Sequence, residues 1–300
     1  DDKEKDCMRY VLENDTLRVE IDSFGAELKS VKRKSDDKEY MWYADKKYWG
    51  RTSPVLFPFV GNCRNKEYRY GGKTYAIGQH GFARDMEHTM ESQTADTIWF
   101  SLHSNEETME KYPFAFVLKI GYNLTGNELK VMWKVENPDT KTLYFSIGAH
   151  PAFLCPFNGE ENKLGYGLQF AGLKEVHHHG NTPDTGLAVM SEDIVIPLEN
   201  EKVYFTPGFF DRCTYMVEGK QTGEVSLVTP DGKPYVTMDF DAPLFAIWSP
   251  EGKDAPFVCI EPWYGRCDAD DFDGTLEERA YENAVEPEQI FEASYSIRYL

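Results

Sequence analysis

A histidine and a glutamate each stand directly before a proline, and each follows a short run of strand-forming apolar residues. They are His150 before Pro151 and Glu261 before Pro262. Because proline cannot donate a ladder hydrogen bond and biases the preceding residue toward extended backbone, each side chain is predicted to lie where a core strand ends. An imidazole and a carboxylate can give and take protons near neutral pH, so the pair indicates general acid–base chemistry. A carboxylate beside an imidazolium is expected to raise the pKa of His150 and lower the pKa of Glu261.

Two other segments carry groups suited to holding a ligand. His80 precedes Gly81, a residue that lets the backbone turn or approach a ligand closely, and Arg84 follows in the same segment. Arg64 ends an apolar segment that contains two prolines, and its guanidinium offers a fixed fork of donors to hydroxyl or anionic oxygens. A lone histidine is more often structural than catalytic, so the functional prediction depends on these segments occurring together.

The elements that must position these residues are strands. Apolar and polar residues alternate with the period of a half-buried strand in residues 17–21, 97–102 and 117–122. Hairpin turn signals lie at residues 71–72, 125–127 and 230–232. Helical signals are confined to residues 105–111, and no βαβ alternation, repeat or long linker is present. The sequence therefore predicts an all-β fold with few short helices, a large antiparallel β-sandwich that forms a single domain over residues 1–300.

Composition narrows the classes of partner. Of the 300 residues, 41% are hydrophobic and 14% aromatic, which is enough for a substantial core. The formal charge of −19 opposes binding to phosphate backbones and anionic membrane surfaces. No apolar stretch approaches membrane-spanning length. We therefore expect a small-molecule partner, and neither a nucleic acid nor a membrane.

Cysteine and histidine placement gives no metal signature. The six cysteines are scattered without a CxxC pair, which predicts reduced thiols and a cytoplasmic protein. Because the chain begins without Met, export followed by removal of a leader stays open as an alternative. Three consecutive side chains, His177 to His179, cannot all point at one ion from an extended chain, so this segment is predicted to be a solvated loop.

Taken together, four segments resemble the aldose 1-epimerase (galactose mutarotase) family, most closely its LacX-like and hexose-phosphate mutarotase-like branch. They are residues 54–64, 79–84, 147–153 and 259–265, in the order found in the family. The Arg64 segment departs from the family pattern, since Asn62-Cys63 replaces the usual Gly-Arg pairing. The resemblance implies a galactose mutarotase-like β-supersandwich, which agrees with the strand pattern.

The resemblance also implies an activity and a set of roles. Glu261 would be the general base that removes the proton of the anomeric hydroxyl, and His150 the acid that protonates the ring oxygen. The pyranose would open and close again as the other anomer, without a cofactor or a metal. The substrate-binding candidates are His80, Arg64, Asp211 and Arg84. The protein would be a monomer or a homodimer that binds a sugar.

Three alternatives stay open at this point. The substrate is either a free aldose or a hexose 6-phosphate; the acidic chain favours the free sugar unless Arg64 and Arg84 point into one cleft. A non-catalytic carbohydrate-binding β-sandwich would need hydrogen bonders and stacking aromatics but no working acid–base pair. A glycosidase would use two carboxylates, such as Glu261 with Asp211.

Overall fold

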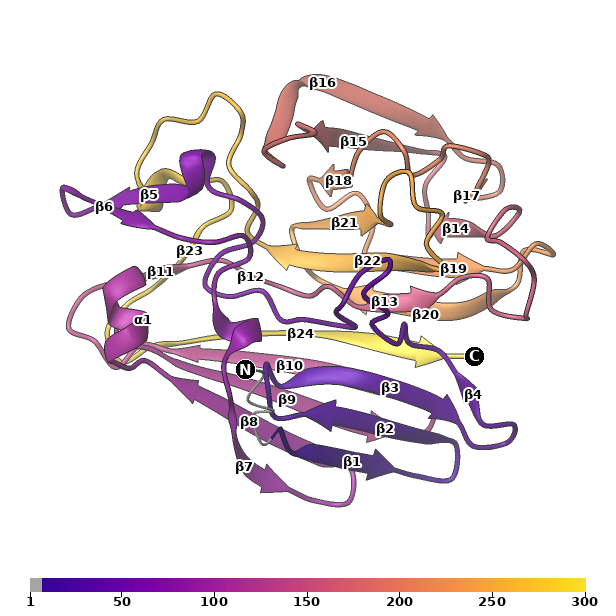
Figure 1. Cartoon of the computed structure of the whole chain (residues 1–300), viewed down its shortest axis with the longest axis horizontal. Helices are drawn as coiled ribbons and strands as arrows, with labels where there is room; N and C mark the ends of the chain where they lie inside the picture. The colour runs from indigo at the N-terminus through magenta and orange to yellow at the C-terminus, as the bar shows by residue number, and fades with distance from the viewer. Residues whose placement is uncertain (1–6) are drawn as a thin grey trace.

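The computed structural model describes residues 7–300 and is rich in strands and poor in helices (Figure 1), which confirms the predicted all-β fold. Within the described part of the chain, the largest sheet has nine antiparallel strands in the order β17-β14-β19-β20-β24-β10-β9-β8-β7. They are β17 (Lys202–Tyr204), β14 (Gly167–Phe170), β19 (Glu224–Val228), β20 (Pro234–Phe240), β24 (Ile290–Tyr299), β10 (Glu128–Glu136), β9 (Val117–Thr125), β8 (Thr97–His103) and β7 (Thr89–Gln93).

A second sheet is built around strand β22 and has the order β12-β22-β21-β18-β15-β16, with β13 also paired to β22. Its strands are β12 (Ile147–Gly148), β13 (Ala152–Leu154), β22 (Phe257–Tyr264), β21 (Leu244–Trp248), β18 (Tyr215–Glu218), β15 (Glu175–Asn181) and β16 (Ala188–Pro197). Strand β22 is thus flanked on both sides, and its residues are almost all buried.

Smaller elements complete the fold. A sheet of four strands contains β1 (Arg9–Glu13), β2 (Leu17–Asp22), β3 (Glu27–Arg33) and β4 (Lys38–Glu39). Two-stranded ladders join β5 (Glu67–Tyr70) to β6 (Lys73–Ala76) and β11 (Leu143–Phe145) to β23 (Asn283–Val285). The helices are α1 (Glu106–Lys111) and three 3₁₀ turns: η1 (Arg64–Lys66), η2 (Ala83–Asp85) and η3 (Leu276–Glu278). None of the described helices is long and apolar enough to cross a membrane.

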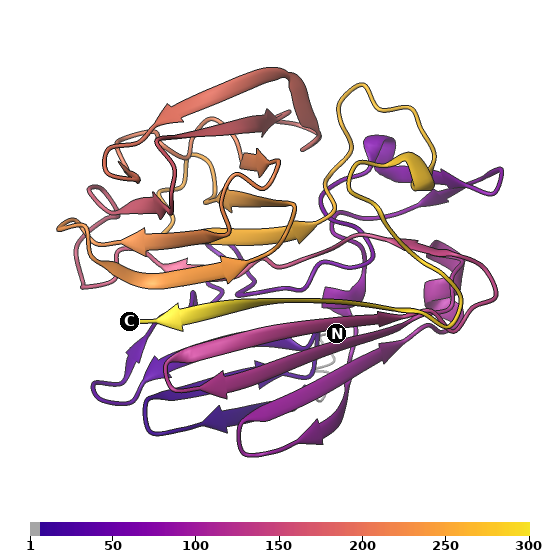
Figure 2. The ribbon, with the colours of Figure 1, turned by 180° about the vertical axis from the view of Figure 1, so that it is seen from behind.

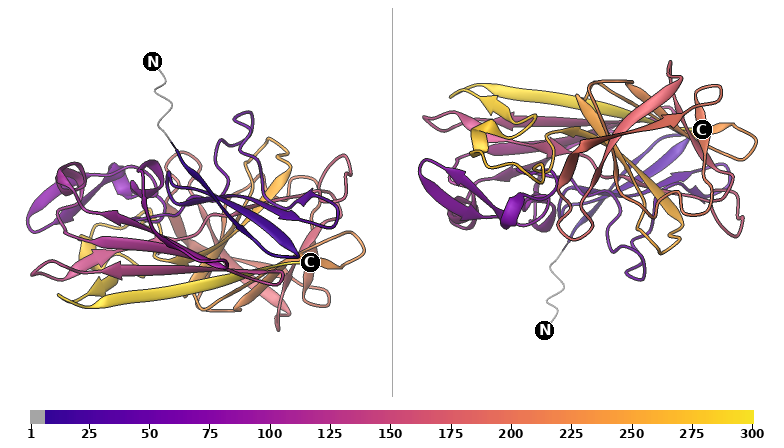
Figure 3. Two further views of the ribbon diagram at one scale, coloured as in Figure 1. Left: turned by 90° about the horizontal axis from the view of Figure 1, so that it is seen from below. Right: turned by 90° about the horizontal axis from the view of Figure 1, so that it is seen from above.

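The nine-stranded sheet runs through the whole molecule and is covered by a different sheet at each end (Figures 2 and 3). The four-stranded sheet packs on its β8–β10 end, where the rings of Tyr10 and Phe100 lie 5.4 Å apart. The β22 sheet packs on its β14–β20 end, through ring contacts such as Phe240 with Phe245 at 5.2 Å. One cluster of buried side chains extends from Leu12 to Tyr299 and joins both ends.

Local signals located most of the turns correctly, and also the single α-helix found within residues 7–300. The glycine-containing turns join β5 to β6, β9 to β10 and β19 to β20 as predicted. Helix α1 begins after Asn105, whose side chain accepts a hydrogen bond from the backbone N–H of Thr108 at 2.9 Å, as an N-cap does.

Two local predictions are wrong. The His177–His179 run is not a loop: it lies within strand β15, where His177 and His179 face outward and His178 is buried. Strand β22 does not end at Glu261 but continues through Pro262 to Tyr264. Proline is accommodated there because the ladder on one side of β22 is interrupted at this point, so its missing N–H disrupts few hydrogen bonds.

Candidate active site

The interruption beside β22 brings the two proline-linked residues together. Strand β13 pairs with β22 through Ala152 and Cys259, and β12 pairs with the same strand through Gly148 and Trp263. Both ladders keep one register, so His150, in the gap between them, comes opposite Glu261. Side chains that stand opposite in an antiparallel pair lie on the same face of the sheet. The two X-Pro segments therefore face each other across one gap in the ladder between β22 and the β12–β13 segment.

His150 and Glu261 form a close, buried pair. The Nε2 atom of His150 lies 3.4 Å from Oε2 of Glu261, and the side chains are 9% and 1% exposed. Neither carboxylate oxygen, nor Nδ1 of His150, has a hydrogen-bond partner among the described residues. The indole of Trp49 stacks on the imidazole with ring centroids 4.7 Å apart, and Trp248 meets it edge-on at 5.3 Å. The aromatic rings fix the plane of the imidazole, while Nδ1 of His150 and both carboxylate oxygens of Glu261 lack a well-formed hydrogen bond among the described residues.

Burial controls the protonation of the pair. It raises the pKa of Glu261 well above its usual range. Burial first, and then the positive charge of Arg84, lower the pKa of His150 to about 3. Both directions are opposite to those predicted from the sequence, because the loss of water around each group outweighs their mutual attraction. Burial therefore favours the uncharged form of each of the two groups.

His80 lies beside the pair and has a defined tautomer. Its backbone N–H donates to the carbonyl of Gly61 at 2.9 Å, and its Nδ1 accepts from the Gly61 N–H at 2.9 Å. Burial lowers the pKa of His80 well below its usual value, so the ring is neutral and its proton resides on Nε2. The ring meets that of His150 edge-on, with centroids 5.6 Å apart. His80 thus offers one N–H donor next to the acid–base pair.

The backbone at His80 is built for this position. His80 has φ +63° and Gly81 has φ +69°. A Cβ atom on Gly81 would lie 2.4 Å from the carbonyl oxygen of Phe57, so only glycine fits beside that segment. Phe82 then donates to the same Phe57 carbonyl at 3.0 Å and fixes the loop.

His80→Asn is expected to lower kcat/KM for the reaction proposed below by about 10²-fold, because one preorganised donor is lost. Asn tolerates positive φ and its side-chain oxygen can still accept from Gly61, so the loop is expected to stay folded. Steady-state kinetics with the sugar substrate would measure the loss. His103→Asn, an exposed position at the end of β8, is the matched control. Equal kinetics for the two variants would contradict a role for the His80 donor.

His80, His150 and Glu261 line a cavity of about 490 Å³, a size typical of small-molecule sites. Trp49, Trp248 and Trp263 contribute aromatic wall. The rest is made by polar residues from five separate segments of the chain, which are Asn62, Gln79, Arg84, Asn181, Asp184, Thr185, Thr214, Glu251 and Lys253. The lining thus combines aromatic faces with many hydrogen-bond donors and acceptors, as a polyhydroxylated ligand requires.

Arg84 is the arginine that enters this cavity. Its Nη2 donates to the Gln79 carbonyl at 2.9 Å, while its Nε has no hydrogen-bond partner and lies 3.8 Å from Asp85. Asp85 is instead held by Arg51 at 2.8 Å. Burial lowers the pKa of Arg84 to about 10, so it stays charged at neutral pH with its charge only partly neutralised.

Arg64 and Asp211 are not brought to this cavity, and their predicted placement is corrected here. The Nη1 of Arg64 donates to the Phe272 carbonyl at 3.0 Å and lines a separate hollow, because the chain turns away through η1 directly after Asn62. Asp211 lines another cavity, where its Oδ1 accepts from the N–H of Gly252 at 2.9 Å. Through this hydrogen bond Asp211 holds the loop that carries Glu251 and Lys253, on the side of the loop away from His150 and Glu261.

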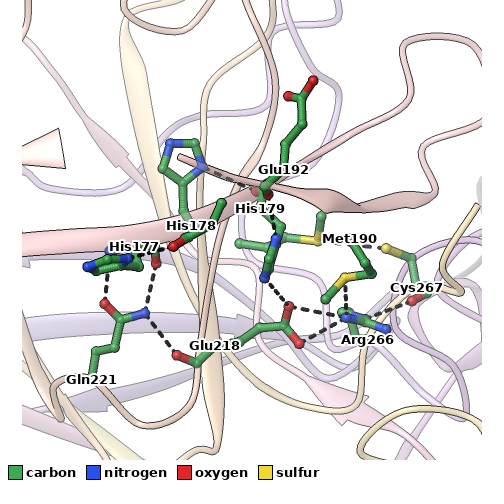
Figure 4. A network of polar contacts seen from close by, with 11 residues as sticks. His177, His178, His179, Met190, Glu192, Glu218, Gln221, Arg266 and Cys267 are labelled. Carbon is green, nitrogen blue, oxygen red and sulfur yellow. Dashed lines mark hydrogen bonds and ion pairs between the residues drawn. The ribbon is translucent and has the colours of Figure 1, made fainter. Parts of the chain in front are cut away.

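The wall formed by Met216 and Cys267 is supported by a buried network (Figure 4). The Nη1 of Arg266 donates to both carboxylate oxygens of Glu218, at 2.9 and 3.1 Å, and its Nε donates to the Cys267 carbonyl at 3.2 Å. Glu218 also lies 3.6 Å from Nε2 of His179. Of the three consecutive histidines, His179 is thus the one that contacts the network behind the cavity wall.

Sequence reasoning missed Trp49 and the loop residues of the cavity. Trp49 carries no proline or glycine signature, and its ring is placed by a backbone contact: its carbonyl accepts a hydrogen bond from the Trp42 indole at 2.9 Å. The 181–186 and 250–253 segments are polar and turn-like, so nothing in their composition separates them from ordinary surface loops.

Known proteins of one family match this chain over nearly its whole length. The sequence model of the family described as aldose 1-epimerase matches residues 8–268. The chromosomal protein LacX of Lactococcus lactis is 32% identical over 98% of this chain and 100% of its own length. A galactose mutarotase related enzyme from Lactobacillus acidophilus is 37% identical, with a TM-score of 0.92 over 98% of this chain and 97% of that one. A galactose mutarotase-like protein from Lactobacillus casei is 29% identical, with a TM-score of 0.89 over 98% and 100% of the two chains.

Proposed function

Because this chain belongs to the aldose 1-epimerase family, we propose that it is an isomerase that interconverts the α and β anomers of a hexose. The observation that carries the proposal is the buried His150–Glu261 pair, 3.4 Å apart across the gap in the ladder beside β22 and facing a cavity of sugar size. Histidine and carboxylate are the two groups that this ring opening requires, one on each oxygen of the anomeric centre.

In the proposed mechanism, Glu261 takes the proton of the anomeric hydroxyl while His150 gives a proton to the ring oxygen. The C1–O5 bond breaks and C1 becomes an aldehyde carbon, so protons and electrons balance without an added reagent. Rotation about the C1–C2 bond presents the other carbonyl face. The same groups then act in reverse and close the ring as the opposite anomer.

Burial of the pair favours this chemistry in a specific way. Ring opening starts from carboxylate and imidazolium and ends with carboxylic acid and neutral imidazole. The neutral form is the one that burial stabilises, as the directions of the two pKa shifts indicate. Loss of water around the pair therefore lowers the free energy of the opened state relative to the charged pair.

His80 and Arg84 are suited to hold the sugar oxygens in this scheme. The Nε2–H of His80 is a fixed donor beside His150, and donors preorganised toward oxygens that gain charge are an effective source of catalysis. The free Nε of Arg84 supplies a second donor with a positive charge.

We favour a free hexose over a hexose 6-phosphate. Of the two arginines suggested by the sequence, only Arg84 lines the cavity, and the loop cation Lys253 is offset there by Asp184 and Glu251. A glycosidase is disfavoured because Asp211 and Glu261 line different cavities. A non-catalytic carbohydrate-binding sandwich would not need a desolvated acid–base pair.

Magnetisation exchange between anomers in NMR tests the proposal. With purified protein, exchange is expected to accelerate for galactose or glucose and to be slower for glucose 6-phosphate at equal concentration. Faster exchange for the phosphate would reverse the proposed preference. Sugar binding without any acceleration would contradict an enzymatic role, and release of free sugar from an aryl glycoside would favour the glycosidase.

A further inference from the structure

A cysteine thiol lies next to the acid–base pair and takes no part in the proposed reaction. Cys259 and Glu261 are alternate residues of β22, so their side chains share one face, with His150 opposite. One ligand atom from each of these three residues lies within 4.8 Å of the other two. In the described part of the chain, no other three His, Cys, Asp or Glu side chains form such a group.

The spacing suits a small tetrahedral ion. At the usual zinc–ligand lengths, two ligand atoms of a tetrahedral site lie about 3.4 to 3.6 Å apart. The nitrogen of His150 and the oxygen of Glu261 are already 3.4 Å apart, and a thiol within 4.8 Å needs only a small side-chain rotation. One nitrogen, one sulfur and one oxygen ligand are therefore already close to the spacing of a tetrahedral zinc site.

The atoms are also available, and the charges balance. Among the described residues neither oxygen of Glu261 has a well-formed hydrogen bond, the Trp263 indole being the nearby donor, and Cys259 is fully buried. One thiolate and one carboxylate neutralise a divalent cation, so the complex adds no net charge to a site without water. His150 and Glu261 line the cavity, so the fourth position of the ion faces that side, as in open zinc sites.

We propose that Cys259, His150 and Glu261 form a binding site for a thiophilic divalent cation such as Zn²⁺, which blocks the acid–base pair when bound. A sulfur ligand selects Zn²⁺ or Co²⁺ over Mg²⁺ and Ca²⁺, which prefer all-oxygen sites. The ion is an inhibitor here and not a cofactor. The binding is independent of the proposed function, whereas the inhibition rests on it.

Cobalt is the first probe, because a thiolate bound to Co²⁺ gives a charge-transfer band in the near ultraviolet that histidine and carboxylate ligands do not give. The full chain should carry Cys7→Ser, since Cys7 is the one exposed cysteine among six and would bind metal adventitiously. Titration with Co²⁺ alone is expected to give the band, and one equivalent of Zn²⁺ is expected to remove it. Excess Mg²⁺ should leave it unchanged.

Cys259→Ser is expected to abolish the band and to weaken Zn²⁺ binding, measured by calorimetry, by roughly tenfold or more. The matched control is Cys267→Ser, a cysteine of the same cavity outside the group, which should keep the band. Near-ultraviolet circular dichroism checks that both variants are folded, and Glu261→Gln, which retains the thiol, should also weaken Zn²⁺ binding. A band that persists in Cys259→Ser, or unchanged Zn²⁺ affinity in both ligand variants, overturns the site.

The inhibition is tested separately on anomer exchange. Zn²⁺ is expected to suppress exchange at concentrations that fill the site, and less so in Cys259→Ser. Bound Zn²⁺ with unchanged exchange would overturn the blocking role alone. Metal-free protein without any exchange would instead refute the proposed function, while the cobalt band still decides whether the site exists.

Discussion

Glu261→Gln is expected to lower kcat for anomer exchange by about 10²- to 10⁴-fold, the usual contribution of a general base, while the melting temperature stays the same or rises. Gln has the shape of Glu but cannot take a proton. The carboxyl group of Glu261 is 1% exposed, and burial raises its pKa by more than the nearby Trp263 indole lowers it, so folding gains little from this group. Kinetics by NMR exchange and thermal melts of the two proteins would measure both effects.

The sign of the stability effect follows from the raised pKa. A carboxyl group whose pKa is higher in the folded than in the unfolded state binds its proton more tightly when folded. Its cost to stability therefore appears as the pH rises above the ordinary carboxyl pKa and grows toward the folded value. The stability gain of Glu261→Gln should be present at neutral pH and disappear in acid. A variant that melts lower than wild type at neutral pH would contradict this account.

Glu282 provides a control for buried carboxylates in general. Burial raises the pKa of Glu282 to about 7, but this side chain accepts from Ser146 at 2.8 Å and from Arg279 at 3.1 Å. Removing one partner of a buried ion pair leaves the other uncompensated, so Glu282→Gln is expected to destabilise the fold. Opposite changes in melting temperature for Glu261→Gln and Glu282→Gln would distinguish a carboxylate with a catalytic role from one with a structural role.

His150→Asn is expected to lower kcat by a similar 10²- to 10⁴-fold, since it removes the acid that protonates the ring oxygen. Groups that act as one unit are strongly non-additive, so the double variant with Glu261→Gln should be hardly slower than the slower single variant. Exchange kinetics of the two single variants and the double variant would measure these losses, and circular dichroism would confirm that all three are folded. Near-normal exchange in either single variant, or losses that multiply, would reject the pairing of roles.

The two residues of the candidate site could be singled out from sequence because each stands before a proline. His150-Pro151 and Glu261-Pro262 were predicted to lie where core strands end, whereas His150 lies between β12 and β13 and Glu261 lies within β22. That they face each other across one gap depends on the register of segments more than one hundred residues apart, which no local pattern encodes. The hairpin turns and the N-cap of α1 are local features, and these were predicted correctly.

The failures have physical causes of the same kind. Arg64 and Asp211 were assigned by motif position, whereas in the structure each of them lines a cavity other than the one that contains His150 and Glu261. The directions of the pKa shifts were wrong because desolvation depends on how completely a group is covered, and only the assembled sheets determine that. Trp49 is placed by a contact with Trp42 that is invisible in the sequence pattern.

Strand β22 carries Cys259, Glu261 and Trp263 between two paired neighbours, whereas the polar walls at residues 181–186 and 250–253 belong to loops. Laboratory evolution of this protein therefore has two separable targets. We expect substitutions in the loops to change the hydrogen-bonding pattern of the cavity wall and to leave the side chains of β22 in place. For the proposed reaction, libraries confined to those loops are therefore expected to change the preferred sugar without loss of turnover.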